Sequence, residues 1–153
     1  MITPLNYPKI ELKLRQKEKG IYVWCAFRKR ELLLTPEEWV RQHILHFLVA
    51  YKSVPLPLIA SEYALEINQL KRRCDGVVFD RKGKATAVIE CKAPEIKLTE
   101  AIFHQIAQYN FKLKVEWLIM SNGIETIIAN VNQSTGEIQY LNEIPDYSIM
   151  IDK

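Results

Sequence analysis

Residues 73–92 read RCDGVVFDRKGKATAVIECK, and this stretch predicts two short strands joined by a tight turn. Apolar runs rich in Val, Ala, Thr and Ile flank a polar turn at residues 81–84, which is typical of a β-hairpin. Asp75 opens the first run, and Glu90 and Lys92 stand near the end of the second. Side chains alternate between the faces of a strand, so Glu90 and Lys92 share a face, and the hairpin brings Asp75 back toward them.

These three charged groups have two interpretations. Two carboxylates and one ammonium at the end of an apolar sheet are costly unless each has a partner. Carboxylate oxygens suit Mg²⁺ or Mn²⁺, and a nearby Lys can orient a water molecule or stabilise charge that develops on a phosphate. The alternative is an exposed hairpin with an ordinary cross-strand ion pair. The motif alone supports both interpretations equally.

Composition is that of a globular chain in a reducing compartment. The 153 residues fit a single domain over residues 1–153, with 48% hydrophobic and 25% charged residues. The net charge of +3 is compatible with nucleic acid but too small to argue for it. Three Cys without metal-ligand spacing argue against a disulfide framework and indicate a cytoplasmic location. No signal-peptide pattern or apolar run of membrane-spanning length is present, so no membrane association is expected.

The N-terminal part predicts a β-hairpin followed by a helix. Alternating apolar residues predict a β-hairpin over residues 9–27, and basic residues at 28–30 lead into the helix. Thr35 is expected to be the N-cap, with Glu38 completing a capping box, and the helix is expected to end near Lys52.

Polar side chains on this helix also receive predictions. Glu37 lies four residues before Arg41, so the two are neighbours on one face. Dipole complementation and capping are sufficient to explain Glu38. His43 and His46 are expected on the helix surface rather than at a metal, since no third ligand is evident.

The segment before Asp75 predicts a strand and a basic turn. Residues 58–67 are expected to form a partly buried strand, and residues 68–73 a polar turn. Lys71 and Arg72 are interpreted as solvated, although they could also contact a phosphate backbone. Arg73 stands two residues before Asp75, and is the better candidate for a role in a site.

The rest of the chain predicts one helix and three strands. Thr99 is expected to cap a helix that ends near Lys112, and the tail after residue 141 has too little pattern for a prediction. The three strands are predicted at residues 115–120, 124–131 and 138–141. From the first helix onward, the predicted order is therefore α-β-β-β-α-β.

This order and the charged residues together resemble the PD-(D/E)xK nucleases. Asp75 and Glu90-Cys91-Lys92 have the spacing of that signature, with Cys74 in place of the usual Pro. The resemblance implies an α/β, restriction-endonuclease-like αβββαβ core over about residues 30–131, in which helices flank a central mixed sheet. The N-terminal β-hairpin is an addition outside this match.

Three further motifs narrow the resemblance. The acidic helix start at residues 36–42 is similar to the first helix of the family, and Arg73-Cys74-Asp75 resembles its R-x-D entry. Gln105 and Tyr109 are similar to its Q-x-x-x-Y motif. Together they most resemble the N-terminal nuclease domain of type I restriction enzyme R subunits.

The resemblance implies a role for each motif residue. Asp75 and Glu90 would hold Mg²⁺ or Mn²⁺, with the backbone carbonyl of Cys91 as a third ligand. Lys92 would position the attacking water or stabilise phosphorane-like charge. Glu37 would be the helix acid, chosen over Glu38, and would polarise Lys92 or a metal-bound water.

Other residues would contact the substrate. Gln105 and Tyr109 would orient the site or meet the DNA backbone. The DNA-contact candidates are Lys71, Arg72 and Arg73.

The implied function is a metal-dependent DNA endonuclease. No Walker A motif or room for a translocase motor is present, so the chain would be a stand-alone relative, or a subunit that takes specificity from a partner. A homodimer would suit a double-strand cut. The alternatives are a non-catalytic DNA- or protein-binding module and a hydrolase of small phosphate esters. No feature reads a 2′-hydroxyl, so RNA stays open as a substrate.

Overall fold

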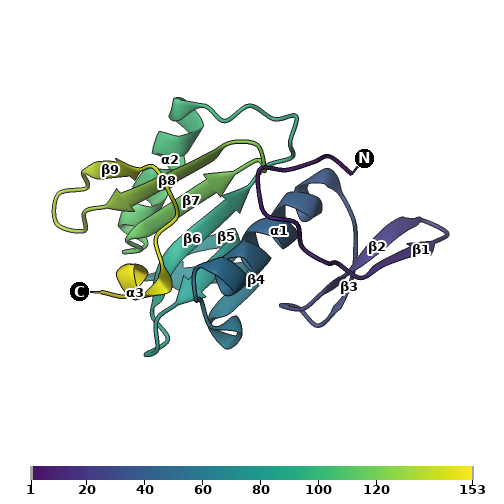
Figure 1. Cartoon of the computed structure of the whole chain (residues 1–153). Helices are drawn as coiled ribbons and strands as arrows, with labels where there is room; N and C mark the ends of the chain where they lie inside the picture. The colour runs from purple at the N-terminus through teal and green to yellow at the C-terminus, as the bar shows by residue number, and fades with distance from the viewer. Residues whose placement is uncertain (1, 153) are drawn as a thin grey trace.

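Two separate β-sheets organise the chain in the computed structural model, which describes residues 2–152 (Figure 1). The smaller sheet is antiparallel and consists of β1 (Leu14–Lys17), β2 (Gly20–Cys25) and β3 (Arg30–Leu33). The larger sheet has the strand order β4-β5-β6-β7-β8-β9 and is mixed, because β6 and β7 pair in parallel and the other neighbours are antiparallel. Its strands are β4 (Ile59–Ile67), β5 (Leu70–Phe79), β6 (Ala85–Cys91), β7 (Trp117–Ser121), β8 (Thr126–Val131) and β9 (Ile138–Leu141).

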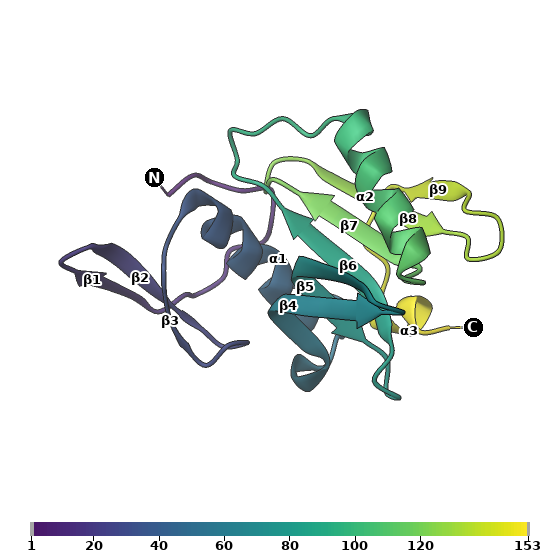
Figure 2. The ribbon, with the colours of Figure 1, turned by 180° about the vertical axis from the view of Figure 1, so that it is seen from behind.

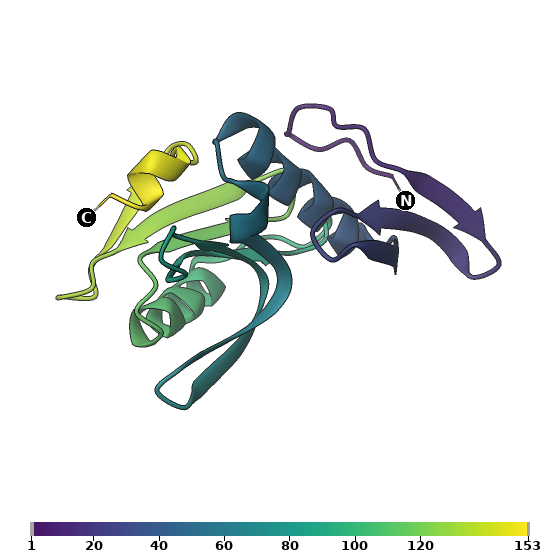
Figure 3. The same cartoon turned by 90° about the horizontal axis from the view of Figure 1, so that it is seen from below.

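Helices cover both faces of the larger sheet. The helical elements are α1 (Pro36–Tyr51), the short 3₁₀ helix η1 (Leu56–Leu58), α2 (Glu100–Lys112) and α3 (Tyr147–Met150). The long helices α1 and α2 lie on opposite sides of the sheet, as the view from below shows (Figure 3). The observed order α1-β4-β5-β6-α2-β7 confirms the predicted mixed α/β arrangement, including the strand at residues 138–141.

Strand β6 is the centre of the core because both of its faces are covered. Ala87 and Ile89 pack with α1, whereas Val88 packs with α2. A strand with two buried faces reads as a continuous apolar run, which explains the sequence ATAVIEC. Glu90 is the single charged residue of this strand, so its carboxyl must find a partner.

Gly76 allows α1 to approach β5 closely. A Cβ atom at this position would lie 2.8 Å from Leu45 Cδ2 and 3.3 Å from Ile89 Cβ, so even alanine would collide with the packed core. Arg41 stands one helical turn before Leu45, and Asp75 adjoins Gly76 in β5. The missing side chain at Gly76 therefore helps bring Arg41 and Asp75 together.

The N-terminal residues before β1 cross the larger sheet at the turn between β7 and β8. The backbone N–H of Asn6 donates to the carbonyl of Gly123 at 2.7 Å, and the Tyr7 hydroxyl donates to Ser121 Oγ at 2.9 Å. Leu5 lies against Gly123, where an added Cβ would be 2.5 Å from Leu5 Cδ2. We call residues 5–7 the N-terminal strap.

The N-terminal hairpin prediction is partly wrong. The first strand begins at Leu14 rather than residue 9, and the turn comprises Glu18 and Lys19. The chain then adds a third strand at residues 30–33, where basic residues were expected only to lead into the helix. Lys29 and Arg30 are exposed and stand just before the apolar residues Leu32 and Leu33. This order does not show the alternation of polar and apolar residues that predicts a strand.

The predicted turn over residues 68–73 is also wrong. Only Asn68 and Gln69 form the turn, with φ of 51° and 68°, a left-handed geometry suited to a two-residue hairpin. Strand β5 therefore starts at Leu70 and contains the basic run, so Asp75 lies within the strand rather than at its start. The strands predicted to begin at residues 115 and 124 begin two residues later.

The surface prediction for the helix histidines fails at His43. His43 is buried, its ring lies 4.3 Å from that of Trp39, and its Nδ1 is 2.8 Å from the Trp39 carbonyl. His46 is half-buried beside the Phe27 ring. His46 loses exposure to Phe27, which lies 19 residues earlier in the chain, a contact that helical periodicity does not reveal. No helix within residues 2–152 has the length and apolar character to cross a membrane.

Candidate functional site

Asp75 and Glu90 come together at one end of the β5–β6 pair. The ladder pairs Gly76 with Ile89, which makes Asp75 and Glu90 neighbours at the next step. Asp75 Oδ2 accepts a hydrogen bond from the backbone N–H of Cys91 at 2.7 Å, and Oδ1 accepts one from Arg41 Nη2 at 2.9 Å. The fold thus fixes the Asp75 carboxylate between α1 and the end of β6.

Arg41 connects three carboxylates from within the protein. It is buried, and its guanidinium forms ion pairs with Glu38 and Asp75 and a 3.3 Å contact with Glu37 Oε1. Burial acts to lower the pKa of Arg41, but Glu38 and Asp75 outweigh it and raise the pKa above its ordinary value. Arg41 therefore remains a permanent cation at the base of the site.

Glu37 and Glu38, the two acids at the start of α1, have different surroundings. Thr35 Oγ1 accepts from the Glu38 backbone N–H at 3.0 Å, which confirms Thr35 as the N-cap. The Glu38 carboxylate does not complete a capping box; it binds Arg41 and accepts from Gln42 Nε2 at 2.9 Å. Glu37 is about half exposed, and burial and Asp75 raise the pKa of its carboxyl while Arg41 and Lys92 lower it.

Glu90 is enclosed on the side of the sheet that α2 covers. It forms an ion pair with Arg72, whose Nη1 also donates to Asn110 Oδ1 at 3.0 Å. Burial raises the pKa of the Glu90 carboxyl to about 8, with Asp75 adding to the rise and Arg72 and Lys92 opposing it. Asp75 and Glu90 therefore repel each other when both are ionised, although each has a guanidinium partner.

Lys92 lies close to this group without a fixed partner. Its backbone N–H donates to the Ser121 carbonyl at 2.9 Å, so the strand geometry holds its main chain. Its ammonium lowers the pKa of both Glu37 and Glu90, which means that it lies near both carboxyls. Within residues 2–152 it makes no ion pair shorter than 4 Å.

The basic residues of β5 behave differently from their prediction. Arg72, interpreted as solvated, is the residue that binds Glu90, whereas Arg73 and Lys71 are exposed. The cause is the two-residue turn before β5, which puts Arg72 on the side of the sheet that faces α2. Arg73, the expected site residue, has its side chain in solvent instead.

Tyr109 lies beside the site and Gln105 lies further out. The Arg72 guanidinium stands 5.3 Å from the centre of the Tyr109 ring, and the Tyr109 hydroxyl donates to the Lys71 carbonyl at 3.1 Å. Gln105 is exposed one turn earlier on α2. The predicted Gln-Tyr pair therefore contacts the site through Tyr109 and Arg72.

Sequence reasoning missed Arg41 and Asn110 as parts of the site, and it named Arg72 only as a candidate for DNA contact. Asn110 is fully buried and donates from Nδ2 to the Trp117 carbonyl at 3.1 Å, so it anchors Arg72 to β7. Its signal was available, because Asn110 interrupts the apolar stripe that Phe103 and Ala107 begin on α2.

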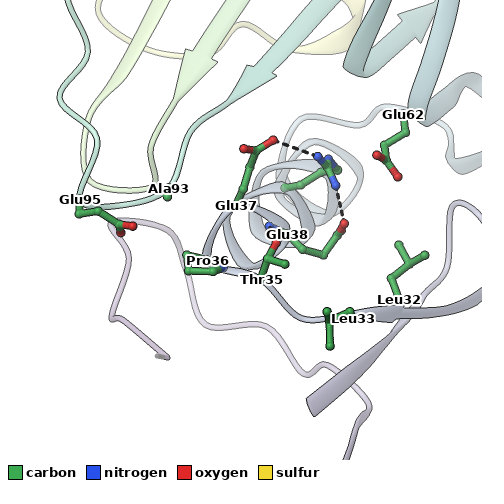
Figure 4. Close-up of a pocket in the computed structure, with 10 residues that line it drawn as sticks. Leu32, Leu33, Thr35, Pro36, Glu37, Glu38, Glu62, Ala93 and Glu95 are labelled. Carbon is green, nitrogen blue, oxygen red and sulfur yellow. Dashed lines mark hydrogen bonds and ion pairs between the residues drawn. The ribbon is translucent and has the colours of Figure 1, made fainter. Parts of the chain in front are cut away.

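A cleft of about 550 Å³ opens beside Glu37 (Figure 4). The start of α1 forms its floor, β3 and Glu62 of β4 form one wall, and residues 93–95 after β6 form the other. Glu62 is held by an ion pair with Arg28, which precedes β3. The smaller sheet therefore contributes to the entrance of the candidate site.

The oxygen atoms of this site are of the kind that binds a hard cation, but among the described residues they are not arranged as a complete metal site. No group of three His, Cys, Asp or Glu side chains in the described part of the chain is arranged to hold a metal. Asp75 and Glu90 provide two carboxylates, and Mg²⁺ commonly binds one or two carboxylates while keeping several waters. Cys91, whose backbone carbonyl is the third predicted ligand, directly follows Glu90 in the sequence.

Replacing Glu90 with Gln should remove a pH dependence of stability. In metal-free protein the folded-state pKa of about 8 exceeds the ordinary 4.5, so folding favours the protonated form. This contribution is complete below pH 4.5 and is lost as the pH rises toward 8. Between pH 5 and 8, wild-type protein should lose about 1 kcal/mol of unfolding free energy per pH unit relative to Glu90→Gln.

Urea unfolding in EDTA at several pH values measures this difference. The exposed Glu137→Gln is the matched control and should follow wild type. Parallel curves for wild type and Glu90→Gln would show that Arg72 keeps Glu90 ionised throughout.

Comparisons with known proteins concern the fold and the family of the chain. No curated protein matches the chain. Among solved structures, a fragment described as the HsdR subunit of a type I restriction enzyme from Vibrio vulnificus YJ016 is similar to it, with a TM-score of 0.51 and 19% identity. That match covers 74% of this chain and 24% of the other, so this chain spans about a quarter of the length of that structure.

The family model described as type I restriction enzyme R protein N terminus matches residues 36–145, from the first residue of α1 to just beyond β9. This confirms the resemblance to type I R subunits, and it leaves the smaller sheet outside the matched region. The chain belongs to the family of type I restriction enzyme R protein N-terminal domains.

Proposed function

We propose that this chain is a metal-dependent DNA endonuclease of the PD-(D/E)xK type. The observation that supports the proposal is the position of Asp75 at the end of the β5–β6 pair, next to Glu90 and hydrogen-bonded to the Cys91 N–H. Arg41 joins Asp75 to Glu37 at the start of α1. Buried acids with perturbed pKa values beside a cleft are characteristic of catalytic sites. Membership of a restriction-enzyme family supports the same conclusion.

Asp75, Glu90 and the backbone carbonyl of Cys91 would hold Mg²⁺ or Mn²⁺. When bound, such an ion polarises a phosphate oxygen and lowers the pKa of a coordinated water. The Asp75 carboxylate is already oriented by the Cys91 N–H and by Arg41, so its position does not depend on the ion. Glu90 would exchange part of its contact with Arg72 for the ion.

The remaining side chains supply orientation and proton transfer. The Lys92 ammonium would orient the attacking water and stabilise charge that develops on the phosphate. Glu37 has a raised pKa and an exposed side chain, so it can accept a proton at the edge of the cleft. Tyr109 is half-buried and Gln105 is exposed, and this pair would orient the site or contact the DNA backbone. The exposed Lys71 and Arg73 would contact DNA phosphates.

The substrate specificity would come from outside this chain. A partner subunit or a second copy of the chain would supply target selection. The three cysteines at positions 25, 74 and 91 are free and buried, which agrees with a reducing cytoplasmic location.

Incubation with supercoiled plasmid tests the proposal. Wild-type protein should convert supercoiled DNA to the nicked form with Mg²⁺ or Mn²⁺ and leave it intact in EDTA. Circular single-stranded DNA and an RNA of equal length in parallel tubes identify the substrate class.

One observation favours a second function, a non-catalytic DNA- or protein-binding module. Arg41 and Arg72 occupy oxygens of both proposed metal ligands, which satisfies the acids without a cation. DNA binding without cleavage in either metal would establish this alternative.

A further inference from the structure

The smaller sheet has an outer face that its own core does not use. Its inner face buries Val23, Cys25 and Leu32 in a separate small cluster. Residues opposite one another in antiparallel strands share a face, so Tyr22 and Trp24 of β2 lie on the other side with their partners. We define the outer face as Lys13, Arg15, Lys17, Tyr22, Trp24, Glu31 and Leu33.

The outer face combines an exposed aromatic ring with cations. Trp24 is 41% exposed, and it lines a cleft of about 440 Å³ together with Lys13, Leu14, Arg15 and Glu31. Lys17 Nζ lies 4.8 Å from the centre of the Tyr22 ring. The sheet projects from the rest of the molecule beside the start of α1 (Figure 1, Figure 2), so this face is open to a long ligand.

Positive charge is concentrated in this part of the chain. Residues 9–33 contain eight Lys or Arg and three Glu, a net charge of +5. The whole chain has 21 Lys or Arg and 18 Asp or Glu, so the other residues carry −2. The small overall charge therefore conceals a strongly basic segment next to a slightly acidic domain.

We propose that the outer face binds single-stranded DNA. Every base has a flat face that can stack on an exposed aromatic ring, while cations along the same groove contact successive phosphates. Bases in a duplex are already stacked on one another, so Trp24 selects a strand with free bases. Binding of DNA to the outer face does not depend on the proposed nuclease function. Only cleavage of the bound strand depends on it.

The geometry connects this face to the candidate site. Leu33 belongs to the outer face and also lines the cleft beside Glu37, and β3 leads through Leu34 and Thr35 directly into α1. The Arg28–Glu62 ion pair fastens the smaller sheet to β4 at the same place. A strand held on the outer face is therefore directed toward the cleft.

Glu31 limits the charge of the outer face. It forms ion pairs with Lys17 at 2.8 Å and with Arg15 at 3.5 Å, and the hydrogen bond from Lys17 lowers the pKa of its carboxyl. A DNA phosphate would compete with Glu31 for both cations. Removal of this acid should consequently strengthen binding.

Fluorescence anisotropy with labelled dT20 in EDTA tests the proposal. Trp24→Ala should weaken binding about 10-fold, and Trp24→Phe, which keeps a stacking ring, should recover most of it. Arg15→Gln with Lys17→Gln should reduce the slope of log K against log salt by about 1.4. Glu31→Gln should bind dT20 several-fold more tightly than wild type.

Matched controls lie on the far part of the domain. Tyr140→Ala removes an aromatic ring that is 52% exposed on β9, and Lys82→Gln with Lys84→Gln removes two exposed cations from the β5–β6 turn. Both variants should bind dT20 as wild type does. Asp75→Ala should also bind dT20 normally in EDTA, because Asp75 is not part of the outer face. Wild-type protein that binds dT20 but shows no metal-dependent nicking would refute the nuclease proposal alone.

Three results would overturn the outer-face proposal. The first is unchanged dT20 affinity in both Trp24→Ala and the Arg15/Lys17 double variant. The second is tighter binding of a blunt duplex or of rU20 than of dT20. The third is a wild-type dimer in sedimentation that Trp24→Ala makes monomeric without any effect on dT20, which would assign this face to a second copy of the chain.

Discussion

Asp75→Ala is expected to abolish Mn²⁺ binding and to slow metal-dependent plasmid nicking by about 1,000-fold. The carboxylate lost is the better ordered of the two proposed ligands, fixed by the Cys91 N–H and Arg41. Arg41 keeps Glu37 and Glu38 as partners, so the fold should survive the substitution. Calorimetric titration of Mn²⁺ and a gel assay on the same samples measure both effects.

Asp75→Asn and Lys92→Ala sharpen this test. Asp75→Asn keeps an oxygen that can accept from Cys91 but removes the charge, so it should lose metal binding without a change in shape. Lys92→Ala should retain Mn²⁺ binding and lose nicking, and the nearby exposed Lys97→Ala should retain both. Nicking that survives in Asp75→Ala or Lys92→Ala would refute the roles assigned to these residues.

Arg41→Met is expected to lower the free energy of unfolding by about 3–5 kcal/mol. Arg41 is 6% exposed and Glu38 is 5% exposed, so the substitution leaves a buried carboxylate whose remaining partner is Gln42. Asp75 loses its guanidinium at the same time. Urea denaturation at pH 7 measures the loss.

The matched control for this prediction is Arg73→Met. Arg73 is an exposed arginine of β5, and its replacement should change stability by no more than about 0.5 kcal/mol. Arg41→Met combined with Glu38→Gln should recover part of the loss, because the buried charge is gone. Equal stability of Arg41→Met and Arg73→Met would show that Arg41 is not the support of the site.

Local signals predicted the frame of the site well. The N-caps Thr35 and Thr99, the turn at residues 81–84 and the β5–β6 hairpin depend on neighbouring residues, and all are observed. The α-β-β-β-α-β order followed from these elements. Short-range hydrogen bonds and periodicity determine such features, so a single sequence contains them.

Side-chain partners were harder to predict because they depend on a single turn. Five of the six residues at 68–73 are polar, so the segment resembles a loop, yet only Asn68 and Gln69 within it adopt left-handed geometry. Because the next residues continue as β5, Arg72 reaches Glu90 and Arg73 reaches solvent. Neighbouring residues of a strand face opposite sides of the sheet, so the interpretation of Arg72 as solvated was wrong, and the role predicted for Arg73 stays a prediction.

Glu37 and Glu38 illustrate the same limit. The capping-box pattern assigned Glu38 to the helix end, and half of that pattern is present, since its backbone N–H is capped by Thr35. Its carboxylate instead pairs with Arg41 inside the protein. Burial created by another part of the chain, rather than local propensity, decides this partner.

The N-terminal strap has a consequence for the order in which the protein assembles during translation. Tyr7 is separated from Ser121 by 114 residues, so the strap leaves the ribosome long before its docking site exists. Closing so long a loop costs chain entropy, and the contacts that offset this cost form only once β7 and β8 are in place. We therefore expect the strap to dock last, after β7 and β8 have joined the larger sheet.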